Sequence, residues 1–287
     1  AIQTASFLAV GNTVLHVDGM FASYFMVLFS TACFANVLGL NISASFNSAV
    51  TIYILIPFII IPQLLFSGVL VKFDKLNPSI SSKTTAPFIG EIMASRWEFE
   101  ALSVNQFINN KFERHLYAHD KILSMANFKK VYWIPELESK VSLIENTYKD
   151  PDRKEETELI MKLIVNEITK QNKTYPKLAY QNMEEIGSLE NLSSEVFGNL
   201  RNFLRLQRTF YNKLYNHTLD DKDDVISHLR KSDEFDFGEL KMKYRNNALA
   251  DLVTNKNEIS KIETFGTHFI QLEDPIYRDG ETFRSHF

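Results

Sequence analysis

A run without any charged residue extends from Gly19 to Val71. A helix that crosses a bilayer needs about 20 apolar residues, and this run can hold two such helices on either side of a short polar break at 41–48. We therefore expect two adjacent antiparallel membrane helices near residues 20–41 and 49–71, with residues 1–15 as the end of an earlier span. A buried helical hairpin in a soluble core is the alternative. Such helices rarely stay apolar on every face over two consecutive runs of this length.

Two residue types within the run add detail. Pro57 and Pro62 lie inside the second expected span, where they should bend the helix; prolines are tolerated in membrane helices when neighbouring groups satisfy the freed backbone. Cys33 is the only cysteine, so no disulfide can form within the chain. Its apolar surroundings predict a small buried side chain rather than a reactive thiol.

Charge returns abruptly after the apolar run. The chain has a net charge of -4, and every charged residue except Asp18 lies at or after Lys72. Residues 73–111 are expected to form an interfacial loop followed by an amphipathic or re-entrant helix over 88–107, with Trp97 at the membrane surface. The same pattern also suits an ordinary amphipathic helix that caps a soluble domain. The balanced charge gives no electrostatic footprint for nucleic acid, so no nucleic-acid partner is expected.

Residues 112–287 show helical periodicity and few glycines. We expect a helical soluble domain whose residues 112–271 pack as one unit away from the bilayer, with Ser193 or Ser194 capping a long helix that reaches about residue 216. Its remaining helices are expected near 112–127, 136–149, 153–171, 219–231 and 239–272. The predicted fold class is therefore all-α: polytopic membrane helices over 1–72, then a helical soluble domain.

The sequence lacks the common motifs of hydrolytic and redox chemistry. It contains no GxxxxGK[ST], GxSxG, HExxH or CxxC pattern, so neither a phosphate-binding loop nor an enzyme activity is expected in this chain. His115 and His119 are four residues apart and could in principle share a metal ion. No third ligand is evident, so a solvated polar face is the favoured interpretation and no metal site is predicted.

Four stretches resemble one protein family when they are taken in order. They are GLNIS at Gly39–Ser43, NSAVTIYILIP at Asn47–Pro57, LLFSGVLV at Leu64–Val71 and EIMASRWEFEALSVNQF at Glu91–Phe107. Together they resemble the permease half of ABC transporters of the G (White-type) subfamily, especially its long bacterial members. The last stretch resembles the re-entrant segment of the family and includes Arg96, Trp97 and Glu98. Gln106 stands where the family usually has Glu.

This resemblance implies a function and a topology. The chain would be a permease segment of an ATP-driven exporter in the bacterial inner membrane, cut from a longer protein and ending before its last span. Residues 112–287 would form a domain inserted in the last external loop, outside the cytoplasm. The resemblance places Ile61 and Leu64 at the central cavity and Val69 and Leu70 in an apolar valve, with Gly68 allowing close approach of a second copy.

The same resemblance implies partners. ATP and Mg would be bound by a nucleotide-binding domain of the same protein, which would be the ATP-hydrolysing part, and the permease would work as a homodimer in the lipid bilayer. The alternative function is a membrane-tethered helical binding or sensor module without transport. A phosphate loop upstream in the reading frame would favour the transporter.

Overall fold

The computed structural model describes residues 1–15, 17–71, 73, 76–77, 86–231 and 236–278. Its contacts divide the chain into two compact units. The first unit holds Ala1–Tyr117, Val225–Asn255 and the segment from Arg278, and the second holds Ala118–Asp224 and Lys256–Tyr277. Residues 225–255 thus group with the N-terminal part, whereas residues 112–271 were expected to pack as one unit.

The apolar quarter of the chain forms three helices in the first unit. They are α1 (Ile2–Leu15), α2 (Phe21–Ser45) and α3 (Ala49–Leu65). Among the described residues, α2 alone is long and apolar enough to cross a membrane, and α1 and α3 are apolar but shorter. Cys33 is exposed on α2, so the expectation of a buried side chain is not met within this chain.

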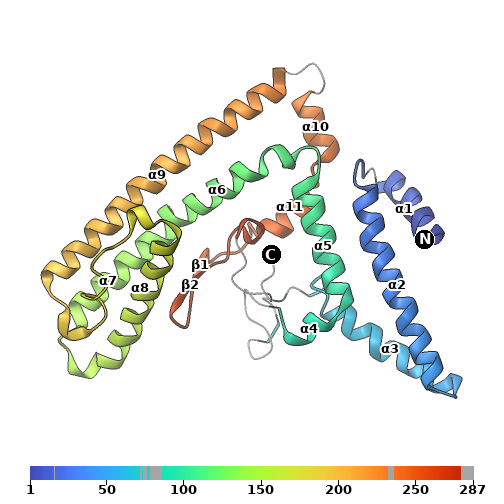
Figure 1. Ribbon diagram of the computed structural model, residues 1–287, viewed down its shortest axis with the longest axis horizontal. Coiled ribbons are helices and arrows are strands. Elements are labelled where there is room, and N and C mark those ends of the chain that lie inside the picture. The colour runs from blue at the N-terminus through green and yellow to red at the C-terminus, as the bar shows by residue number, and fades with distance from the viewer. Residues whose placement is uncertain (16, 72, 74–75, 78–85, 232–235, 279–287) are drawn as a thin grey trace. The chain divides into compact units, whose positions relative to one another are not determined.

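The packing of these helices differs from the expected antiparallel pair. Helix α2 packs against α1 and against α5 (Ala94–Asn109), whereas α3 contacts α5. Figure 1 shows α3 leaving the end of α2 at an angle instead of running back along it. Helix α3 also ends at Leu65 and not near residue 71.

Helix α2 runs through part of the expected polar break. Asn41 donates a side-chain hydrogen bond to the carbonyl of Val37 at 2.9 Å, and Ser45 donates to the carbonyl of Asn41 at 2.7 Å. Polar side chains that bond back to their own helix can be accommodated without ending it. The non-helical residues between α2 and α3 are therefore only Phe46, Asn47 and Ser48.

The rest of the first unit is built on α4 (Phe88–Ile92) and α5, which break at Met93. A 3-10 turn, η2 (Glu113–His115), follows, and α10 (Phe237–Tyr244) and α11 (Asn247–Thr254) come later in the chain. Phe112, Leu116 and Leu240 form a small buried cluster here. The last residues of α9 (Ser194–Lys231) contribute Val225 and Ile226 to this cluster.

The second unit is a helical bundle with its own core. Its helices are α6 (Tyr117–Phe128), α7 (Ile134–Thr147), α8 (Lys154–Thr174) and most of α9. Short 3-10 turns lie at Pro151–Arg153 (η4), Pro176–Leu178 (η5), Leu189–Asn191 (η6) and Pro275–Tyr277 (η7). Trp133, Phe197 and Tyr211 are among its largest fully buried side chains. The prediction of a mostly helical fold is confirmed.

Ser193 caps α9, since its hydroxyl accepts a hydrogen bond from the backbone N–H of Val196 at 3.4 Å. The expected separate helices near 194–216 and 219–231 are one continuous helix. Acidic side chains of α7 pair with basic side chains of α9: Arg208 pairs with Glu138 at 2.9 Å, and Arg201 pairs with Glu145. These pairs are partly exposed, so each contributes little to stability.

The helix expected over 239–272 is wrong beyond α11. Asn255 adopts a positive φ of 46° and ends α11, and strands β1 (Ile262–Phe265) and β2 (His268–Gln271) then form an antiparallel hairpin. Gly266, with φ of 59°, occupies the turn. A positive φ favours glycine because a side chain there is sterically strained.

The hairpin is held to the bundle by a buried carboxylate. Glu167 of α8 accepts a hydrogen bond from the indole N–H of Trp133 at 2.6 Å and from the backbone N–H of Phe269 at 2.9 Å. Asn166 donates to the hydroxyl of Thr267 at 2.9 Å. Trp133 lies in η3 (Lys129–Trp133), a π-helical turn between α6 and α7. A π-turn widens the helix locally and shifts the side chains that follow.

Lys129 lies beside this carboxylate, with its ammonium group 3.7 Å from the ring centre of Trp133. Burial lowers the pKa of Lys129 to about 7, although the negative charge of Glu167 opposes this shift. Between about pH 7 and the ordinary value of 10.5 the unfolded chain binds a proton that the folded chain does not. The free energy of unfolding should therefore rise with pH across this window.

We predict that Lys129→Met flattens this rise. The measurement is the denaturant midpoint of the second unit in the full chain at pH 7 and at pH 9.5, with unfolding monitored by the fluorescence of Trp133 in a Trp97→Phe background. Lys213→Met, at an exposed position of α9, serves as the control and should keep the wild-type pH dependence. An equal rise with pH in Lys129→Met and wild type would contradict the assignment.

Candidate functional site

The four residues that the family resemblance placed at the cavity and the valve lie at the end of α3 and just after it. Ile61 and Leu64 belong to α3 and are 54% and 49% exposed. Val69 and Leu70 follow the helix and are 56% and 65% exposed. Nothing in the described chain covers these four apolar side chains substantially. Such exposure leaves them available to lipid, to a second copy or to a transported molecule.

The turn that carries Val69 is ordered by its own neighbours. Gly68 adopts φ of 81°, and a Cβ atom at this position would lie 3.2 Å from the ring of Phe73. A side chain at residue 68 would therefore be strained and crowded. The space beside Gly68 is filled by Phe73 of the same chain, and not by a second copy as the sequence suggested.

Arg96 is the most deeply buried charge near this turn, with 1% of its surface exposed. Its guanidinium pairs with Glu91 of α4 at 3.0 Å and with Glu100 of α5 at 3.0 Å. Glu100 lies on the same helix as Arg96, so the pair with Glu91 is the one that crosses the break at Met93 and joins α4 to α5. A buried ion pair is weak evidence of net stabilisation, but removing one partner leaves a costly unpaired charge.

Trp97 and Glu98 have specific partners as well. The indole N–H of Trp97 donates to the backbone carbonyl of Glu91 at 2.9 Å, and the guanidinium of Arg96 lies 4.2 Å from its ring centre. Glu98 is half-buried and faces Thr31 of α2. The Arg-Trp-x-Phe-Glu segment therefore joins α4 to α5 and brings a carboxylate against the long apolar helix.

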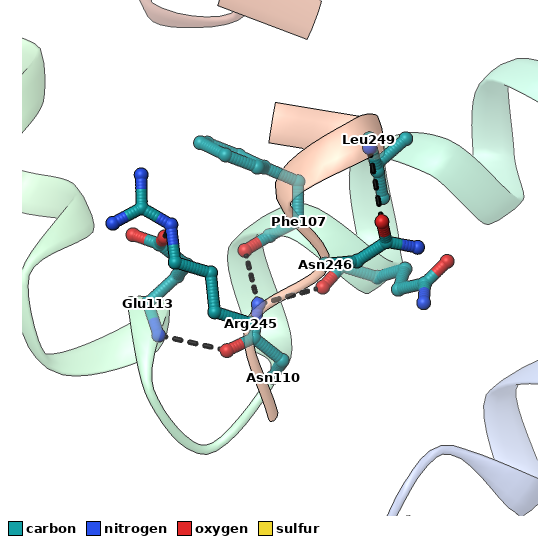
Figure 2. Close-up of a pocket in the computed structure, with 7 residues that line it drawn as sticks. Phe107, Asn110, Glu113, Arg245, Asn246 and Leu249 are labelled. Carbon is teal, nitrogen blue, oxygen red and sulfur yellow. Dashed lines mark hydrogen bonds and ion pairs between the residues drawn. The ribbon is translucent and has the colours of Figure 1, made fainter. Parts of the chain in front are cut away.

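The side chain of Asn110 caps the C-terminal end of α5, and the sequence analysis did not single this residue out. Its side-chain amide donates to the carbonyls of Gln106 and Phe107, both at 2.9 Å, and its oxygen accepts from the backbone N–H of Glu113 at 2.8 Å. Figure 2 shows this amide between the end of α5 and η2. The available signal was an Asn directly after a helical pattern, a common sign of a helix end.

A small hollow borders this corner. It measures about 160 Å³ including its open mouth and is lined by Asn110 and Glu113 together with Arg245 and Asn246 from the link between α10 and α11. Glu113 is buried, and its carboxylate lies 3.4 Å from the guanidinium Nε of Arg245. The side chain of Asn246 caps α11 by accepting from the N–H of Leu249. These polar groups stabilise the corner itself.

No metal centre is found among the described residues, where His, Cys, Asp and Glu do not gather in groups of three or more. His115 lies in η2 and His119 in α6, so the two histidines are not on one continuous helix. The nitrogen Nε2 of His115 accepts a hydrogen bond from Arg114 at 3.2 Å. Burial and the neighbouring Arg114 charge lower the pKa of His115.

Comparison with known proteins bears on the N-terminal part. Residues 1–107 match the family model described as ABC-2 type transporter, a membrane component of transporters. The match supports a permease role in transport, embedding in a membrane and the usual pairing with an ATP-binding component. It ends at Phe107, where the quoted sequence motifs also end. No curated protein and no solved structure matches the chain.

We predict that Arg96→Met destabilises the first unit, because Glu91 and Glu100 lose their buried counter-charge. The expected loss is about 3–5 kcal/mol of unfolding free energy, measured as a lower thermal midpoint in detergent or nanodiscs. Lys243→Ala is the control, since Lys243 pairs with Asp18 at 3.0 Å on an exposed part of the same unit. Adding Glu91→Gln and Glu100→Gln to Arg96→Met should recover part of the loss. Wild-type stability of Arg96→Met would contradict this account.

Proposed function

We propose that the chain is the permease part of an ATP-driven ABC exporter. The observation that carries the proposal is the ABC-2 type transporter match over residues 1–107, which covers α1 to α5. The apolar character of α1, α2 and α3 supports it. The order of the four sequence motifs favours the G (White-type) subfamily and a bacterial inner membrane, with residues 112–287 outside the cytoplasm.

ATP would be bound elsewhere in the assembly. The sequence has no GxxxxGK[ST] loop, so these residues do not fit the phosphates of a nucleotide. We place ATP and Mg on a nucleotide-binding domain of the same protein. The chain itself would contribute the membrane path and no hydrolytic chemistry.

The path would be closed by apolar side chains. A narrow apolar neck stops the passage of water and solutes because it favours dewetting. Val69 and Leu70 would form this neck between two copies of the chain, and Ile61 and Leu64 would face the cavity beneath it. Their exposure in a single chain supports a role that needs a partner copy.

We predict that Val69→Ala with Leu70→Ala raises passive leak severalfold. The measurement is the release of a small entrapped dye from proteoliposomes that contain the assembled transporter without ATP. The matched control is Val10→Ala with Leu15→Ala, since these side chains are 65% and 73% exposed on α1. The control should stay at the wild-type leak. A well-inserted Val69→Ala with Leu70→Ala variant that leaks no more than the control would contradict the proposal that these two residues form a gate.

A further inference from the structure

The end of α3 has to satisfy backbone carbonyls in an apolar environment. The last four carbonyls of a helix lack partners within the helix, and in lipid an unsatisfied carbonyl costs several kcal/mol because no water can reach it. In α3 these carbonyls belong to residues 62–65. Their hydrogen-bond donors must come from the protein.

Two serine hydroxyls supply donors at this helix end. The hydroxyl of Ser95 in α5 donates to the carbonyl of Gln63 at 2.6 Å, and the hydroxyl of Ser67 donates to the carbonyl of Leu64 at 2.9 Å. The carbonyl of Pro62 accepts from the backbone N–H of Phe66 at 2.9 Å. The helix end is thus held partly by α5, more than thirty residues away along the chain.

The Ser67 hydroxyl also fixes the residue that follows. It accepts a hydrogen bond from the backbone N–H of Val69 at 3.2 Å, and Ser67 itself is 3% exposed. Gly68 between them is covered by Phe73. Ser67 and Phe73 therefore hold the backbone of the turn, while the side chains of Val69 and Leu70 remain exposed.

Helix α4 approaches the same turn from the other side of the break at Met93. A Cβ atom on Gly90 would lie 3.4 Å from the carbonyl oxygen of Phe66, an ordinary van der Waals distance, so α4 is in direct contact with the end of α3. The ion pair of Arg96 with Glu91 joins α4 to α5. Ser95 precedes Arg96 and is held in place with it.

We propose that Ser95 is a positioning residue for the gate. Its hydroxyl binds the carbonyl of Gln63 and so holds the end of α3. Ser67 binds the next carbonyl, that of Leu64, and accepts from Val69, so the position of the helix end sets where the backbone of Val69 and Leu70 lies. The effect of Ser95 on gating rests on the proposed function. Its effect on the position of the turn rests on the hydrogen bonds alone.

The test is amide hydrogen exchange of the segment 66–71 in the full chain in nanodiscs, paired with the dye-leak assay. Ser95→Ala should speed exchange in this segment on the order of fivefold, as expected for the loss of one hydrogen bond, and should raise leak. Ser67→Ala should do the same. Ser95→Thr keeps a hydroxyl and should restore both readouts.

Ser45→Ala is the matched control, because the Ser45 hydroxyl also bonds a helix carbonyl but only within its own helix. It should change neither readout. Unchanged exchange in Ser95→Ala would overturn the positioning role. Faster exchange without leak, in a protein whose Val69→Ala with Leu70→Ala variant does leak, would also overturn it. If neither variant leaks while exchange rises, the hold on the turn stands and the gate is overturned.

Discussion

The structure around the end of α3 depends on a rule of membrane interiors: a backbone carbonyl without water must find a donor in the protein. Helix α3 contains Pro57 and Pro62 and ends at Leu65, so both its interior and its end lack some of the usual helical hydrogen bonds. The donors at its end are side chains, Ser67 beside the helix and Ser95 on α5. This need explains why a charged, amphipathic helix packs against an apolar one.

Arg96 is the second constraint on the same region. A buried guanidinium with two carboxylate partners is costly to assemble and more costly to break. Its pair with Glu91 joins α4 to α5 across the break at Met93, next to Ser95. In the second unit Glu167 has a comparable role, since one buried carboxylate joins Trp133 of η3 to the hairpin at Phe269.

Much of the fold could be predicted from sequence, since apolar runs and helical periodicity are local signals. The charge-free run located α2 to within a few residues, and the cap at Ser193 was readable from residue type. The end of α3 was missed because it depends on Gly68 and on Ser95 far along the chain. The hairpin was missed because its short strands are held by Asn166 and Glu167, about a hundred residues earlier.

The candidate site was predictable only in part. The pairing of Arg96 with Glu100 follows from their i, i+4 spacing on one helix. Its pairing with Glu91 does not, because the chain breaks at Met93 between them. The Asn110 cap, with its contacts to both α5 and η2, also arises from a local geometry that periodicity does not reveal.

The central claim, that α2 lies in a bilayer, can be tested with the one native cysteine. Cys33 lies near the middle of α2 and is exposed in the chain, so lipid alone would shield it from a charged, water-soluble thiol reagent. The measurement is its labelling rate in nanodiscs, compared with Asn212→Cys, an exposed position of α9, in a Cys33→Ser background. We predict labelling of Cys33 that is slower by orders of magnitude and becomes comparable after denaturation in detergent. Equal rates in the nanodisc would contradict the account.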